Sequence, residues 1–80
     1  MNRKEIINNI LMRLQEAEVK HPDFPTDMIH QVAIMNEEAG EAIRAALQHE
    51  YENGRKSAVI LELEQTAAMC IRAIENIQIG

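Results

Sequence analysis

The sequence DMIHQVAIMNEEAGEAIRAALQH, residues 27–49, decides the fold. It is one long segment whose apolar and acidic residues both follow the spacing of an α-helix. Apolar residues recur along it at spacings of three and four, which is the period of an amphipathic α-helix. We therefore predict a helix from about Asp27 to His49 or Tyr51. Its main apolar stripe comprises Met28, Ile29, Val32, Met35, Ala39, Ile43, Ala46 and Leu47.

A second face of this helix concentrates negative charge. Glu38 and Glu41 lie about 60° apart at roughly 100° per residue, and more than about 100° from the centre of the apolar stripe. Ile34 and Ala45 share their sector, so we expect this face to contact protein as well. Gly40 interrupts the acidic run and costs about 1 kcal/mol relative to alanine in a helix interior. We expect its missing side chain to let a neighbouring helix or a ligand approach.

Another amphipathic helix is predicted before this segment, from about Asn2 to Val19. Its apolar residues again recur at spacings of three and four. The sequence HPDFP, residues 21–25, ends this helix, because two prolines so close together cannot continue it. Thr26 is the predicted N-cap of the helix that follows.

A third helix is predicted after the stop signal Asn53-Gly54. Ser57 is its predicted N-cap, with a start a few residues earlier as the alternative, and the helix runs to about Ile77. A loop this short between two long helices predicts an antiparallel hairpin. The main apolar stripe of the third helix comprises Val59, Ile60, Leu63, Ala67, Cys70, Ile71, Ile74 and Ile77.

The polar residues of the two hairpin helices are predicted to meet. Glu62 and Gln65 lie off the stripe of the third helix, about 60° apart, whereas Glu64 points to nearly the opposite side and is expected to face solvent. In an antiparallel hairpin, an i,i+3 pair on one helix can face an i,i+3 pair on the other. We therefore expect Glu38, Glu41, Glu62 and Gln65 to surround one point.

Three carboxylates in a partly apolar setting cannot all stay ionised without a counterion. No Lys or Arg is placed in the sequence to pair with all of them. A hard divalent cation with oxygen ligands resolves the conflict, and Mg²⁺ is the ordinary cellular candidate. Two alternatives stay open: the glutamates can be solvated or form interhelical salt bridges, and Gln65 can form an interhelical hydrogen bond instead of binding metal.

The composition favours a small all-α protein that associates. The chain has 80 residues, one Tyr, one Phe and no Trp, and is rich in Ala and aliphatic residues. We predict a single domain, residues 1–80. A domain of this size buries only roughly 60–65% of its extended surface, so a monomer would be marginal. We therefore expect a homodimer or homotetramer.

Charge and cysteine content exclude several classes of function. The net charge of −5 and the scattered basic residues argue against nucleic acid as a partner. Cys70 is the single cysteine, which suggests a reducing compartment, so we expect a cytoplasmic protein. No apolar run reaches membrane-spanning length, so we expect no membrane association.

The acidic motifs resemble those of one enzyme family. Glu38-Ala39-Gly40-Glu41, followed by Glu62-Leu63-Glu64-Gln65 in the run AVILELEQTAAMCIRAIE, is similar to the motifs of the MazG-like all-α nucleoside triphosphate pyrophosphohydrolases. The resemblance extends over about residues 21–77. It implies that an E-x-x-E motif and an E-x-x-D motif on successive helices hold Mg²⁺. The metal binds the triphosphate of an NTP or dNTP while water attacks, releasing pyrophosphate and a monophosphate.

The resemblance also implies roles for single residues. Glu38, Glu41 and Glu62 would be metal ligands and catalytic residues, and Gln65 stands where the family has its fourth ligand, an aspartate. Because Gln65 is neutral, we expect weaker activity or none. The predicted architecture is a three-helix protomer, a hairpin plus an N-terminal helix, that forms a four-helix-bundle-type oligomer. The alternatives are a non-catalytic helical oligomer or regulatory protein with a degenerate site, and a helical module that docks another protein.

Overall fold

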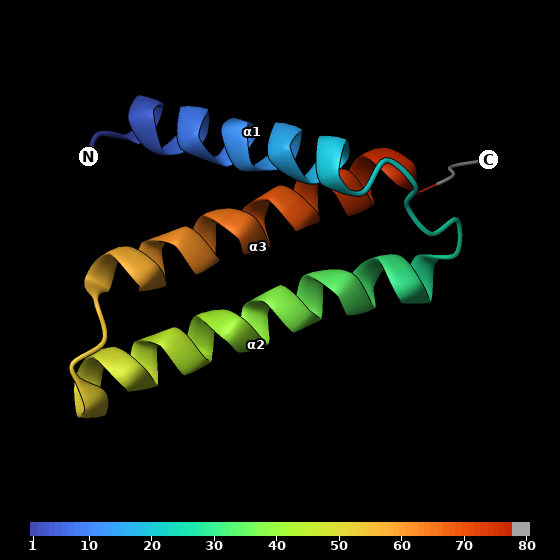
Figure 1. Ribbon diagram of the computed structural model, residues 1–80. Coiled ribbons are helices and arrows are strands. Elements are labelled where there is room, and N and C mark those ends of the chain that lie inside the picture. The colour runs from blue at the N-terminus through green and yellow to red at the C-terminus, as the bar shows by residue number, and fades with distance from the viewer. Residues whose placement is uncertain (78–80) are drawn as a thin grey trace.

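The computed structural model describes residues 1–77 and folds them into three α-helices, without a strand in that range. α1 spans Arg3–Lys20, α2 spans Met28–Glu52 and α3 spans Lys56–Asn76 (Figure 1). The predicted all-α class and three-helix protomer are therefore confirmed. The predicted domain also includes residues 78–80, which lie outside the described residues. Within residues 1–77, no helix is both long and apolar enough to traverse a lipid bilayer.

The starts of α2 and α3 differ from the prediction by one or two residues. Asp27, and not Thr26, caps α2: its side chain accepts a hydrogen bond from the His30 backbone N–H at 3.1 Å and lies 2.7 Å from the His30 ring. α3 begins at Lys56, after Arg55, which makes no side-chain capping bond. The predicted cap Ser57 is thus already inside the helix.

The turn between α2 and α3 forms where Asn53-Gly54 predicts it. Asn53 adopts the left-handed conformation with φ of 60°, and the Gly54 backbone N–H donates to the Gln48 carbonyl at 2.8 Å. A Cβ at Gly54 would lie 2.9 Å from the Gln48 carbonyl carbon, so the close return of the chain requires glycine. α2 and α3 consequently form the predicted antiparallel hairpin (Figure 1).

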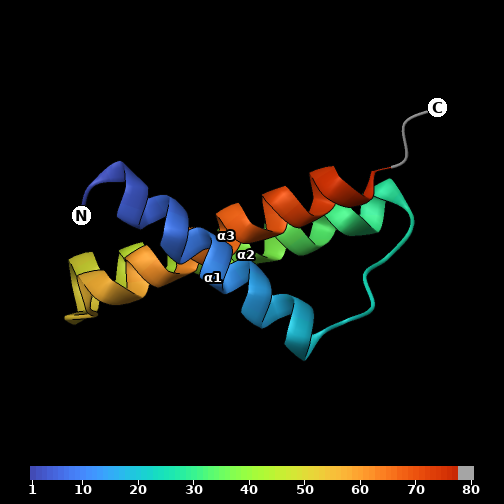
Figure 2. The same cartoon turned by 90° about the horizontal axis from the view of Figure 1, so that it is seen from above.

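α3 is the central helix, because both other helices pack on it. α1 contacts α3, whereas no Cα atoms of α1 and α2 within the described part of the chain approach to 8 Å. Seen from above, α1 crosses the hairpin at an angle (Figure 2). The core lies at this crossing, where Leu14 of α1 packs on Ala68 and Met69 of α3. Partly buried side chains surround it: Ile10, Ala17, Phe24, Ile34, Met35 and Ile71.

An ion pair also joins α1 to α3. The Arg13 guanidinium donates to the Glu64 carboxylate at 3.1 Å, and a second nitrogen of Arg13 donates to Glu16 at 2.8 Å. Glu64 is only 6% exposed, so the prediction that it faces solvent is wrong. The reason is that α1 covers the side of α3 on which Glu64 and Ala68 lie.

The connection between α1 and α2 is fixed to the hairpin by two buried polar side chains. Arg72 donates to the His21 carbonyl at 2.6 Å, and its guanidinium carbon lies 4.6 Å from the centre of the Phe24 ring. Gln31 is 1% exposed and donates to the Pro25 carbonyl at 2.7 Å. Arg72 therefore has a structural role, and Phe24 packs against the core.

The two main apolar stripes predicted for the hairpin are only partly buried within the chain: Met35 and Ile71 pack against the core, but most of the large side chains stay exposed. The contacts of α2 and α3 instead use small residues such as Ala42, Ala45 and Ala73, which are at most 8% exposed and let helix axes approach closely. The exposed members of the two stripes, at 40% exposure or more, are Met28, Ile29, Val32, Ile43, Leu47, Ile60, Leu63 and Ile74. We call the surface formed by Val32, Ile43, Leu63 and Ile74 the outer apolar face, whereas Ile60 borders a hollow beside α1.

The buried ion pair predicts a measurable difference between two glutamates of α3. Glu64→Ala should lower the free energy of unfolding by about 1–2 kcal/mol, because Arg13 loses its partly buried partner. Glu75 lies in nearly the same angular sector of α3 as Glu64 but is exposed. Glu75→Ala should therefore change the free energy of unfolding by less than about 0.5 kcal/mol. Urea unfolding followed by circular dichroism measures both values. Equal losses in the two variants would contradict the packing of α1 on Glu64.

Candidate metal centre

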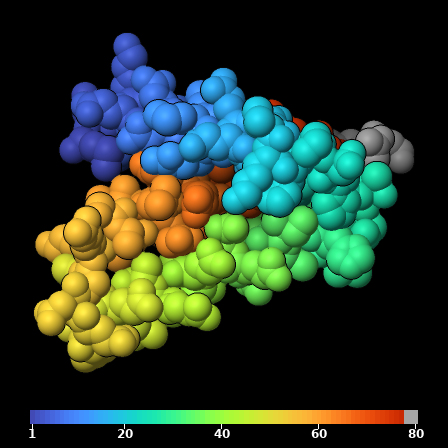
Figure 3. All heavy atoms as spheres, viewed as in Figure 1, coloured from blue at the N-terminus to red at the C-terminus, as the bar shows by residue number. Residues whose placement is uncertain are grey.

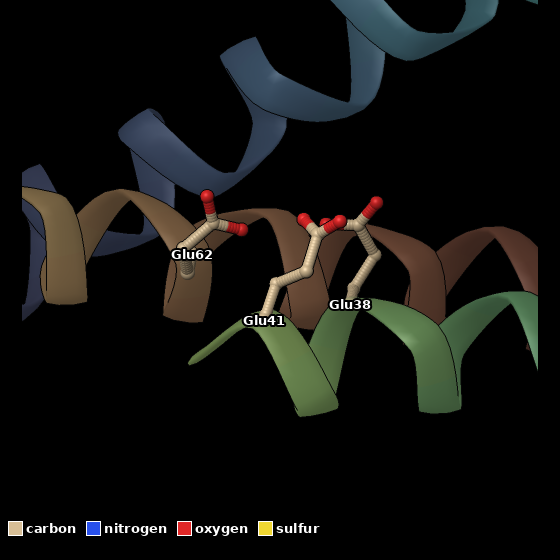
Figure 4. Close-up of side chains that lie close together, drawn as sticks. All are labelled: Glu38, Glu41 and Glu62. Carbon is tan, nitrogen blue, oxygen red and sulfur yellow. The ribbon is translucent and has the colours of Figure 1, made fainter. Parts of the chain in front are cut away.

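Three glutamates of the hairpin converge on one point, and we call them the glutamate triad. Glu38 and Glu41 lie one turn apart on α2, and Glu62 lies opposite them on α3 (Figure 4). One carboxylate oxygen from each residue lies within 4.8 Å of the other two. The i,i+3 spacing and the antiparallel pairing thus bring these side chains together as the sequence predicts.

Two oxygens of the triad are buried and have no hydrogen-bond partner among residues 1–77. They are the Oε2 atoms of Glu38 and Glu62. Glu41, in contrast, is exposed to solvent. A buried carboxylate oxygen without a donor is unfavourable by an amount comparable to a lost hydrogen bond to a charged group. The triad therefore offers two oxygens that a proton or a cation would satisfy.

The electrostatics of the triad agree with this geometry. Burial raises the pKa of Glu38, and the negative charges of Glu41 and Glu37 raise it further. Burial also raises the pKa of Glu62, with the neighbouring charge of Glu41 as the next cause. Both carboxyl groups therefore hold a proton more tightly than an ordinary glutamate does.

No basic side chain in the described part of the chain neutralises the triad. The ion pairs among residues 1–77 join Arg13 to Glu16 and Glu64, and His30 to Asp27, and none involves the triad. Within the described residues the negative charge of the triad therefore has no compensating positive side chain. A divalent cation fits the donor set, since all three donors are carboxylate oxygens, the ligands that Mg²⁺ and Ca²⁺ prefer.

The spacing of the oxygens is also compatible with Mg²⁺. Two ligands at about 2.1 Å from Mg²⁺ lie at most about 4.2 Å apart. The oxygens of the triad lie within 4.8 Å of one another, so rotation of one side chain, or one ligand bound through water, is sufficient for coordination. Magnesium sites commonly combine one or two direct carboxylates with bound water.

A cleft of about 660 Å³ adjoins the triad at Glu38. α3 forms its floor, and α1 and α2 form its walls; Figure 3 shows α3, in orange, between the other two helices. Gln65, which points about 60° away from Glu62 around α3, lines this cleft together with Glu38. We call this space the α1–α2 cleft.

The sequence did not predict the α1–α2 cleft. Its α1 wall includes Arg13, Glu16 and Lys20, which helical periodicity places on a polar face without indicating a neighbour. The cleft exists because α1 packs on α3 at an angle and leaves α2 uncovered. Pairings between residues 51 positions apart, such as Arg13 with Glu64, give no local signal in a sequence.

Gly40 does not serve helix packing within the chain. A Cβ atom built at Gly40 would have no neighbour within 4 Å, so no helix of the chain approaches it closely. The expectation that a neighbouring helix requires this glycine is therefore wrong for the single chain. The space beside Gly40 is open to a ligand or to a second copy.

Comparisons of the chain with models of protein families, with curated proteins and with solved structures find no match. The likeness to MazG-like pyrophosphohydrolases thus rests on the two motifs, and the chain is not assigned to that family. The geometry of the triad and of the α1–α2 cleft stands independently of any relative.

The raised pKa values predict how the metal-free protein responds to pH. The folded state binds protons at Glu38 and Glu62 more tightly than the unfolded chain does, so these groups should stabilise the fold as the pH falls through their raised pKa values. Their contribution is complete below the ordinary glutamate pKa of about 4.3 and is lost as the pH rises to neutral. The melting temperature in EDTA should therefore be higher at roughly pH 4.5 than the loss of other ion pairs alone would allow, and it should fall toward roughly pH 7. Thermal unfolding across this range measures the contribution.

Glu62→Gln reproduces the protonated state at neutral pH. It should raise the melting temperature in EDTA at pH 7 by roughly 2–6 °C and should flatten the pH dependence. Glu50→Gln, on an exposed position of α2, is the matched control and should leave both unchanged. A lower melting temperature of Glu62→Gln than of the original chain at pH 7 would contradict the proposed repulsion.

Proposed function

We propose that the chain is a Mg²⁺-dependent nucleoside triphosphate pyrophosphohydrolase, which converts an NTP or dNTP to the monophosphate and pyrophosphate. The observation that supports this function is the convergence of Glu38, Glu41 and Glu62 with two buried, unpartnered oxygens. A cleft large enough for the remainder of a nucleotide begins at Glu38. The similarity of the two motifs to those of the MazG-like enzymes agrees with this reading.

Each residue of the triad has a place in this reaction. Glu38 and Glu62 hold the cation through their buried oxygens. When bound, Mg²⁺ supplies positive charge that orients the triphosphate and stabilises the charge that develops on it. Glu41 is the exposed member, so it is our candidate general base for the attacking water.

The proposed step is a hydrolysis at the α-phosphorus. The water oxygen forms a bond to this atom, and the bond between the α-phosphorus and the oxygen bridging to the β-phosphate breaks. Pyrophosphate leaves with the bonding electron pair, and the water proton passes to Glu41 and then to solvent. No redox change occurs, and the products are a nucleoside monophosphate and pyrophosphate.

Gln65 favours one alternative function. The family to which the motifs are similar has an aspartate at this position, and a neutral amide supplies less charge to a metal. A weak enzyme, or a non-catalytic helical oligomer or regulatory protein with a degenerate site, is the second candidate. A cytoplasmic location stays a prediction from the single cysteine.

We also propose that a second copy of the chain covers the outer apolar face. Ile43, Leu63 and Ile74 are 64%, 55% and 71% exposed. Helical geometry places each of them more than about 100° around its helix from the residues that line the α1–α2 cleft. Contiguous apolar surface of this kind commonly marks an interface. Two hairpins packed through these faces would form a four-helix bundle and leave the α1–α2 cleft open.

The hydrolase proposal is tested by product analysis with and without Mg²⁺. We expect pyrophosphate and monophosphate to form from at least one NTP or dNTP, and only with a divalent cation. Glu41→Gln should reduce the rate about 100-fold or more, because it removes the base. Glu50→Gln should retain the full rate.

The same samples distinguish the two candidate functions. Mg²⁺ should raise the melting temperature of the original chain, and a non-hydrolysable triphosphate should raise it further, because ligands that bind only the folded state stabilise it. A chain whose melting temperature responds to neither ligand would contradict the hydrolase proposal and favour a structural role.

The oligomer proposal predicts the effect of one charge on the outer apolar face. Ile43→Arg and Leu63→Arg should each convert the protein to a monomer, since a buried arginine without a partner opposes association. Ile7→Arg, at a 49% exposed position on α1, is the matched control and should keep the oligomer intact. Sedimentation velocity measures the mass. Dissociation by Ile7→Arg alone would place the interface on α1 instead.

A further inference from the structure

We infer that Gln65 recognises the nucleoside of the substrate from the floor of the α1–α2 cleft, and so is a specificity residue in place of a fourth metal ligand. The inference rests on the proposed function and names the residue that would select the substrate. Four features of the cleft carry it: its position, its apolar lining, its balance of charge and the unused amide of Gln65.

The position of the cleft suits a ligand whose phosphates lie at the triad. Glu38 belongs both to the triad and to the cleft lining, so the cleft adjoins the triad at this residue. Gln65 lies one turn beyond Glu62 on α3, about 4.5 Å along the helix axis. The cleft continues to Arg72, about another 10 Å along the axis. A base and sugar attached to a triad-bound triphosphate would therefore enter this space.

The apolar lining of the cleft suits the flat faces of a nucleobase. Its apolar side chains come from all three helices and line the cleft together with Gln65: Ala17, Ile34, Leu61, Ala68 and Met69. Phe24 also lines the cleft, but Arg72 already stacks on its ring. Pockets for small organic ligands commonly combine such walls with a few polar groups that fix orientation.

The charges around the cleft favour an uncharged group. Apart from Glu38 at the triad end, the basic and acidic lining residues balance: Arg13, Lys20 and Arg72 against Glu16, Asp23 and Glu37. Arg13 is already paired with Glu16 and Glu64. The interior of the cleft therefore has no excess positive charge for phosphates, which leaves the base and sugar as the part of the substrate that fits.

Gln65 is the polar group on the floor that can read a base edge. An amide carries a donor and an acceptor side by side, so it can bind the complementary donor and acceptor of a base at once. None of the hydrogen bonds between described residues uses the Gln65 side chain. Its amide is therefore free for a ligand, and Gln65 points about 60° away from Glu62, toward the cleft.

The test uses nucleosides without phosphates, so that it does not depend on the metal. We would titrate the full chain in EDTA with adenosine, guanosine, cytidine, uridine and thymidine and follow the Gln65 side-chain amide by NMR. At least one nucleoside should shift this amide. Gln65→Ala and the isosteric Gln65→Glu should weaken binding of that nucleoside about fivefold or more, because one hydrogen bond is lost.

A parallel titration with Mg²⁺ alone separates this inference from the proposed function. Gln65→Ala and Gln65→Asp should keep the Mg²⁺ affinity of the original chain, whereas Glu62→Gln should lose it. Gln15→Ala, an exposed glutamine of α1, should change neither titration. Unchanged melting temperatures of the Gln65 variants in EDTA would show that they fold.

Two results would overturn the inference. One is a Mg²⁺ affinity that falls about tenfold in Gln65→Ala with nucleoside binding unchanged, which would make Gln65 a metal ligand and leave the hydrolase proposal standing. The other is an amide that responds to none of the nucleosides. Nucleoside binding without any Mg²⁺ binding would instead support the role of Gln65 in the cleft and contradict the hydrolase proposal.

Discussion

The hairpin depends on how the repulsion between three carboxylates at the α2–α3 contact is relieved. Packing α2 on α3 removes the Oε2 atoms of Glu38 and Glu62 from solvent without giving them a donor in the described part of the chain. The same burial raises the pKa of both residues. A proton, or the cation proposed for this site, would relieve the repulsion in the packed hairpin. Near neutral pH protons are scarce, so the proposed divalent cation would be the more effective of the two.

The central position of α3 explains the rest of the architecture. α1 and α2 both pack on α3 but not on each other within residues 1–77, so they enclose a cleft on one side of it. On the opposite side, neither helix covers Leu63 and Ile74, which leaves the outer apolar face. One packing arrangement thus produces a polar cleft beside the triad and an apolar surface away from it. A partner chain on the apolar surface would not obstruct the cleft.

The sequence was sufficient to predict features set by local geometry, but not those set by distant packing. The three helices, the Asn53-Gly54 turn and the convergence of the triad follow from periodicity, stop signals and i,i+3 spacing. The burial of Glu64 could not be predicted, because it depends on Arg13, 51 positions away. The packing faces were misjudged for another reason: periodicity identifies apolar area, whereas the helices meet through small residues such as Ala42. Large apolar stripes therefore do not reveal whether they face their own chain or another.

If the chain is the proposed hydrolase, Gln65 stands where the similar family has an acidic ligand, and the difference has consequences beyond a lost charge. Three carboxylates and one divalent cation leave a net charge of about −1 at the triad, and a fourth carboxylate would leave about −2, which a second cation would offset. With an amide in that position, one cation would be enough, and the proposed reaction would need only a single metal. The side chain is then not required for charge balance. Because it lines the α1–α2 cleft one helical turn from Glu62, it is placed to contact the part of the proposed substrate that a metal at the triad would not hold.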